Sequence, residues 1–105
     1  MVTLTDQDNG RHLSIHVGDV LDFHLAENAT TGYRWASDSY DARLFELIEE
    51  TGNYPTAGVG SGGEAILRFR VIGTGSSTLT LKRWRHWEGA GSIVQHFAVT
   101  IDAIP

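Results

Sequence analysis

The chain has 105 residues and a formal net charge of -5, and this acidic balance argues against binding to nucleic acid, which needs a basic face. It contains no cysteine, so disulfides, thiolate metal sites and cysteine nucleophiles are excluded. No apolar run approaches the roughly 20 residues that span a bilayer, so we expect no association with a membrane. The length suits one domain, which we place over residues 1–105.

The N-terminal segment, residues 1–6, lacks the basic and apolar regions of a signal peptide. We therefore expect a cytoplasmic protein. If a leader has been removed from the natural chain, the expected location is instead the periplasm or the extracellular space.

Apolar and polar residues alternate in five stretches, which is the pattern of a strand with one buried face. The apolar positions are Leu13, Ile15 and Val17; Leu21, Phe23 and Leu25; Leu67, Phe69 and Val71; Leu79 and Leu81; and Phe97, Val99 and Ile101. Glycine-containing turns lie between these stretches at 17–19, 73–76 and 88–91. Short strands at this spacing predict an all-β fold, an antiparallel sandwich or barrel.

Residues 42–50 fit two patterns. Leu44, Leu47 and Ile48 have helical spacing, whereas the alternation from 45 to 49 also fits a strand. We interpret the segment as a strand, because the rest of the chain offers helices little support.

Three segments between strands have compositions that a simple connection does not need. The first loop is Asn28-Ala29-Thr30-Thr31-Gly32-Tyr33, whose Asn and Gly suit a tight turn. The second loop is Gly58-Val59-Gly60-Ser61-Gly62-Gly63, whose missing side chains let the backbone lie close to another surface. The third loop is Arg85-His86-Trp87-Glu88, which places a large aromatic residue at a strand end, as interfaces often do. Each segment alone is most simply a connection.

Taken in this order and spacing, the three loops resemble those of the chagasin family of cysteine peptidase inhibitors. That family carries an Asn-Pro-Thr-Thr-Gly-(Tyr or Phe) loop, a Gly-x-Gly-Gly loop and an Arg-Pro-Trp loop. The matching residues are Asn28, Ala29, Thr30, Thr31, Gly32 and Tyr33, then Gly60, Ser61, Gly62 and Gly63, then Arg85, His86 and Trp87. The likeness runs from about residue 18 to 101 and includes Trp35, which we expect between the two sheets.

The chain departs from the family pattern at three positions. Ala29 and His86 stand where the family has proline, and Arg83 stands where it usually has an aromatic residue. Loss of a proline removes a constraint on φ and raises the entropy lost when a loop is ordered. These changes bear on affinity more than on function.

The resemblance implies an immunoglobulin-like sandwich that inhibits papain-like cysteine peptidases reversibly, tightly and without a covalent bond. By that resemblance the first loop sits over the catalytic Cys-His pair, with Thr31 and Gly32 at its centre. Trp87 stacks on an aromatic surface of the peptidase, and residues 60–63 lie along the non-primed side of the cleft. The implied partner is the peptidase, no cofactor is needed, and we expect the free protein to be a monomer.

Enzyme chemistry is the first alternative. The glycines of 58–63 formally match G-x-G-x-x-G, but a dinucleotide site needs a helix after the motif, and the alternating residues 64–69 predict a strand. A metal site is the second, but His12 and His16 would lie about 13 Å apart along a strand, too far to share an ion. The third alternative is an immunoglobulin-like module for carbohydrate, adhesion or assembly, since a fold does not fix a function. Titration against papain separates this third alternative from an inhibitor.

Overall fold

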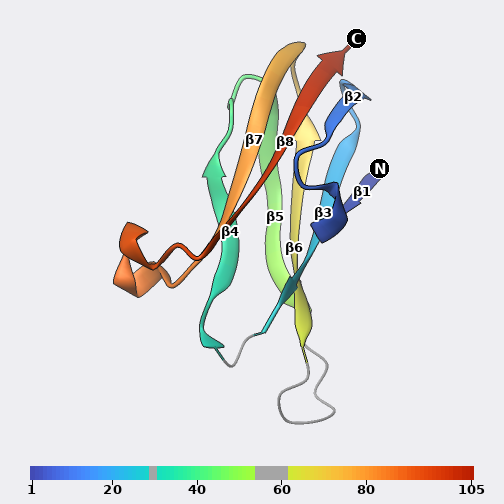
Figure 1. Cartoon of the computed structure of the whole chain (residues 1–105). Coiled ribbons are helices and arrows are strands. Elements are labelled where there is room, and N and C mark those ends of the chain that lie inside the picture. Colours follow the sequence, from blue (N-terminus) through green and yellow to red (C-terminus); the bar gives the residue numbers. More distant parts are fainter. Residues whose placement is uncertain (29–30, 54–61) are drawn as a thin grey trace.

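The structure of the protein is a computed structural model, and the residues that it describes are 1–28, 31–53 and 62–105. These residues form two four-stranded sheets packed face to face (Figure 1). The strands are β1 (Val2–Thr5), β2 (His12–His16), β3 (Val20–Glu27), β4 (Arg34–Ser39), β5 (Phe45–Asn53), β6 (Gly63–Val71), β7 (Gly75–Trp84) and β8 (Gln95–Ile104). In the described part of the chain, no helix is long and apolar enough to cross a membrane.

The first sheet has the order β1-β3-β6-β5 and the second the order β2-β8-β7-β4. Pairs β3–β6, β5–β6, β7–β8 and β4–β7 are antiparallel, which confirms the predicted all-β sandwich. The edge strands β1 and β2 pair in parallel with β3 and β8, a feature that alternation alone does not predict.

The ambiguous segment is a strand from Phe45 onward, as predicted. Before the strand the chain makes one helical turn, in which the amides of Leu44 and Phe45 both donate to the carbonyl oxygen of Asp41, at 3.0 and 2.9 Å. This single turn precedes β5 and is not continued as a helix.

The core lies between the two sheets and is built from the alternating residues of the predicted strands, with one exception: Val17 was predicted to face inward, but it lies in the turn after β2 and is 38% exposed. Phe23 of the first sheet contacts Phe69 and, across the interface, Phe97 of the second sheet, each edge to face with ring centroids 5.8 Å apart. Trp35 is 4% exposed and lies in the same cluster, which confirms its predicted position.

The outer face of the first sheet carries a network of charged side chains centred on His24. Its ring nitrogens Nε2 and Nδ1 each lie 2.8 Å from a carboxylate, of Asp22 and Glu64 respectively. Arg68 donates to both Asp22 and Glu49. Both ring nitrogens can donate only when the imidazole is protonated, and the hydrogen bonds to Glu64 and Asp22 accordingly raise the pKa of His24.

This network predicts a loss of stability at alkaline pH. A His whose pKa is raised by folding stabilises the fold fully below its unfolded value, near 6.5, and this contribution disappears as pH rises through the higher folded pKa. We expect the unfolding free energy of the wild type, measured with urea between about pH 5.5 and 9, to fall relative to that of His24→Gln. The other four histidines are common to both proteins. Parallel pH profiles would show that His24 is not the group responsible.

Candidate functional site

The three loops connect β3 to β4, β5 to β6 and β7 to β8, and these strand ends all lie at the end of the sandwich away from the C-terminus (Figure 1). Because β3 and β4 belong to different sheets, the first loop crosses from one sheet to the other. Of the predicted site residues, Ala29, Thr30, Gly60 and Ser61 lie outside the described residues. The other nine lie at this end of the molecule.

The first loop is bonded internally through Thr31. Its hydroxyl donates to the carbonyl oxygen of Asn28 at 2.9 Å and accepts the amide of Tyr33 at 3.3 Å. Gly32 follows with φ of 78°, in the left-handed region where a side chain costs energy. The Thr-Gly pair thus closes a tight turn.

Arg85 of the third loop holds the first loop from the side. Its Nε and Nη2 donate to the carbonyl oxygen of Thr31 at 3.1 and 2.9 Å. Its guanidinium carbon lies 4.2 Å from the ring centroid of Tyr33, within the range of a cation–π contact. The remaining Nη1 donates to Glu88 of its own loop at 3.0 Å. One side chain therefore joins two loops that are 54 residues apart.

Trp87 joins the same two loops by packing. A Cβ added at Gly32 would lie only 2.8 Å from Cη2 of the Trp87 ring, so the indole rests directly against the glycine. The side chain is nevertheless 62% exposed, as the sequence predicted for a large aromatic at this strand end. His86 contacts the indole edge to face, with centroids 5.2 Å apart. The ring is thus held at one edge and open over most of its surface.

The connection from β7 to β8 is shaped by two short 3-10 turns, η3 (His86–Glu88) and η4 (Ala90–Ser92). The hydroxyl of Ser92 accepts the Arg85 amide at 3.0 Å and lies 2.9 Å from the Arg85 carbonyl oxygen and 2.7 Å from that of Gly89. These bonds constrain the loop where His86 replaces the family proline. Sequence reasoning missed Ser92, which lies outside the motif.

The stem of the second loop lies beside the stem of the first. Gly63 begins β6 and pairs in register with Glu27, the last residue of β3. A hollow of about 220 Å³ lies against both stems, lined by Ala26, Glu27, Asn28, Gly62, Gly63 and Arg83. Glycine at 62 and 63 leaves this space open.

Glu27 is a second residue that sequence reasoning missed. Its side chain is 4% exposed, and Oε1 accepts the backbone amide of Trp35 at 2.6 Å. Trp35 Nε1 donates to the carbonyl oxygen of Ala26 at 3.0 Å, so two bonds tie the strands on either side of the first loop. A signal was present, because Glu27 continues the inward alternation of Leu25 immediately before the Asn28 motif.

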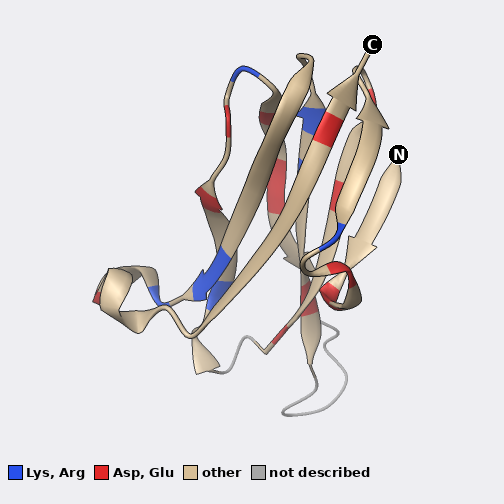
Figure 2. Ribbon diagram, turned by 45° about the horizontal axis from the view of Figure 1, so that its top comes forward, with Lys and Arg blue, Asp and Glu red and all other residues tan. Residues whose placement is uncertain are grey.

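Basic residues are concentrated at this end of an otherwise acidic chain. Half of its eight Lys and Arg residues lie here: Arg34 of β4, and Lys82, Arg83 and Arg85 at and just beyond the end of β7 (Figure 2).

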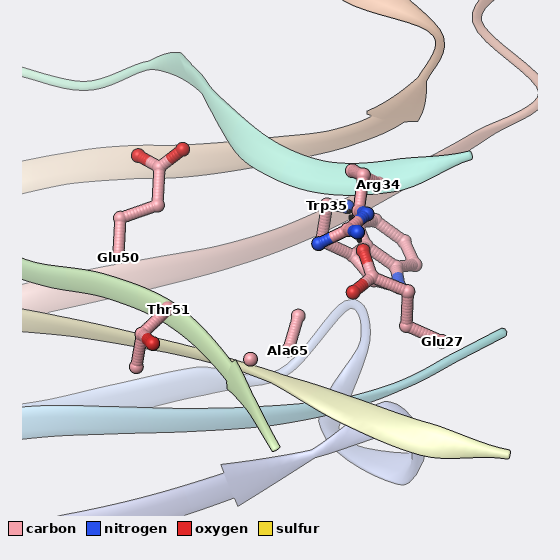
Figure 3. A pocket seen from close by; sticks show the side chains of 7 residues that line it. Glu27, Arg34, Trp35, Glu50, Thr51 and Ala65 are labelled. Atoms are coloured by element: carbon pink, nitrogen blue, oxygen red, sulfur yellow. Dashed lines mark hydrogen bonds between the residues drawn. The ribbon is translucent and has the colours of Figure 1, made fainter. Parts of the chain in front are cut away.

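A cleft of about 460 Å³ opens between β4 and β5, with Glu27 and Arg34 pointing toward one another on one side and Glu50 on the other (Figure 3). Within the described residues, no three His, Asp or Glu side chains come together as a metal site would require.

The family model described as chagasin family peptidase inhibitor I42 matches residues 14–101. Chagasin of Trypanosoma cruzi is 25% identical over 105 residues, 95% of this chain and 96% of that protein. The crystal structure of the cysteine protease inhibitor EhICP2 from Entamoeba histolytica has a TM-score of 0.84 at 23% identity, and the match covers 98% of this chain and 95% of that one. The structure of PbICP-C in complex with falcipain-2 has a TM-score of 0.72 at 12% identity, with 99% and 100% covered. These structures confirm the predicted immunoglobulin-like sandwich.

Proposed function

This chain belongs to the chagasin family of cysteine peptidase inhibitors, and we propose that it blocks the cleft of papain-like cysteine peptidases with its three loops. The first loop enters the catalytic centre, the second lies along one side of the cleft, and Trp87 anchors the third on the other side. The inhibitor forms no covalent bond. The chain is an inhibitor and not an enzyme.

The observation that carries this proposal is the family match over residues 14–101, which includes all three loops. The links between the loops give the proposal a physical basis. Arg85 donates to the Thr31 carbonyl and Trp87 rests against Gly32, so these two residues of the first loop are held in place before the loop meets a partner. A preorganised loop loses less conformational entropy on binding.

Titration tests the function directly. We expect stoichiometric loss of papain activity and no effect on trypsin, because the loops fit one shape of cleft. Calorimetry should show that a papain-like peptidase with its catalytic cysteine replaced by alanine still binds. Equal inhibition of papain and trypsin, or no binding to the alanine variant, would overturn the proposal.

The role of the first loop is tested by Thr31→Glu. A bulky charge at the centre of a desolvated interface should weaken inhibition by at least about 2 kcal/mol, the scale of a hot spot. The matched control is Thr74→Glu, which adds the same charge at an exposed position in the turn between β6 and β7, at the opposite end of the sandwich. Inhibition constants for both variants against papain decide the question. Full inhibition by Thr31→Glu would show that the first loop is not the part that enters the centre.

A further inference from the structure

The inward-facing pattern of the sandwich does not end with apolar residues at the loop end. On β3 the buried series of Leu21, Phe23 and Leu25 continues to Glu27. On β7 the series of Leu79 and Leu81 continues to Arg83, which pairs in register with Trp35 of β4. A layer of opposite charges therefore closes the core directly beneath the loops.

Glu27, at the end of β3, is surrounded by groups from β4, β5 and β7. Its carboxylate accepts the Trp35 amide at 2.6 Å, and the charges of Arg34 on β4 and Arg83 on β7 act on it. Glu50 on β5 lies across the cleft. With Arg83, Glu27 also lines the hollow beside Gly62 and Gly63 of the second loop.

The ionised form of Glu27 costs folding energy. Burial raises the pKa of this carboxyl, and the Trp35 hydrogen bond and the charges of Arg34 and Arg83 lower it without compensating fully. The charge of Arg83 also carries a cost of burial, because its Nε is buried and has no hydrogen-bond partner among the described residues. Charged groups in such surroundings carry a desolvation penalty that a neutral group does not.

We propose that Glu27 is a positioning residue for inhibition, whose ionised carboxylate, opposed by Arg83, holds the stems of the first and second loops in their binding arrangement. The inference rests on the proposed function of the loops. The carboxylate accepts a hydrogen bond from the backbone where the first loop rejoins the sheet, and its charge attracts Arg83, which lines the same hollow beside the second-loop stem. A neutral side chain at position 27 leaves the fold intact but lets both stems move. Ordering the stems when the peptidase binds then costs conformational entropy.

A fall in pH should change the contribution of Glu27 to stability and its contribution to inhibition in opposite directions. Because folding raises the pKa of Glu27, the native state binds this proton more tightly, and the contribution of Glu27 to stability grows as pH falls through the folded pKa. Protonation at the same time removes the charge that positions the stems. The advantage in inhibition that ionised Glu27 supplies therefore declines on acidification. A residue with only a structural role would change both quantities together.

The test compares wild type, Glu27→Gln and Glu50→Gln against papain. Glutamine can still accept the Trp35 amide, so Glu27→Gln imitates the protonated form. At pH 7 we expect it to weaken inhibition about tenfold, as loss of one charge-assisted interaction does, with a melting temperature equal to or above that of wild type. Glu50→Gln removes a carboxylate from the opposite wall of the same cleft and should leave inhibition unchanged.

The pH profile completes the test. The ratio of the inhibition constants of Glu27→Gln and wild type, measured with one peptidase from about pH 7 to 4.5, should fall toward 1 as Glu27 becomes protonated. Taking the ratio cancels the titration of the peptidase. Unchanged inhibition by Glu27→Gln, a ratio independent of pH, or equal losses of stability and inhibition would each overturn the positioning role. Failure of wild type to inhibit in the same assay would instead overturn the proposed function.

Discussion

Replacing Trp87 by alanine should weaken peptidase inhibition by about 30- to 1000-fold, which corresponds to roughly 2–4 kcal/mol. The indole is 62% exposed yet rests against Gly32, so it offers a large apolar surface without a large cost in conformational freedom. Inhibition constants against papain measure the loss. The melting temperature should barely change, because an exposed loop residue contributes little to the core.

Trp84 is the matched control for this substitution. It is the last residue of β7 and lies on the face opposite Leu79 and Leu81, where the ammonium group of Lys82 is 3.8 Å from its ring centroid. Trp84→Ala should lose some stability through this contact and little inhibition. A larger loss of inhibition at Trp84 than at Trp87 would mean that the third loop has been aligned incorrectly with the family motif.

Gly32→Ala should weaken inhibition by at least about tenfold, because it acts on both loops at once. The backbone φ of 78° is unfavourable for alanine, at a cost of about 1–2 kcal/mol of stability. The added methyl group would also lie 2.8 Å from the Trp87 ring. The ring is the end of an exposed side chain and can move away, so the collision displaces the anchor and adds little to the loss of stability.

Gly10→Ala isolates the backbone effect. Gly10 has nearly the same φ, 85°, and a Cβ placed there meets nothing within 4 Å. We expect urea unfolding to show similar losses of stability for the two variants, while only Gly32→Ala inhibits papain less well. If Gly32→Ala inhibits as well as Gly10→Ala does, the contact between Gly32 and Trp87 has no part in binding.

The sandwich could be predicted because its signal is local. Alternation such as Leu21, Phe23 and Leu25 reports the two faces of a strand wherever that strand pairs, and the buried residues of β3 follow it. Residues 42–50 were ambiguous because the register of β5 shifts between Leu47 and Glu49, so that Ile48 interrupts the strict alternation of a strand. The parallel pairing of β1 with β3 and of β2 with β8 could not be predicted, because the alternation within a strand does not say which strand lies beside it or in which direction.

The residue types of the three loops were visible in the sequence, because each loop is a short continuous motif. The links between the loops were not. Arg85 reaches the Thr31 carbonyl across 54 residues, because β4 pairs with β7 and sets Arg34 opposite Trp84. The pattern also indicated an exposed Trp87 but not its contact with Gly32.

The sequence by itself determined the all-β class, the buried face of β2, β3, β6, β7 and β8 and the motifs that identify the family, because periodicity and motif spacing are properties of neighbouring residues. Only the tertiary structure decided that Glu27 and Arg83 end the core as opposed charges and that Arg85 and Trp87 hold the first loop. Electrostatic and packing energies depend on distance in space. Those distances exist only after the two sheets have packed together.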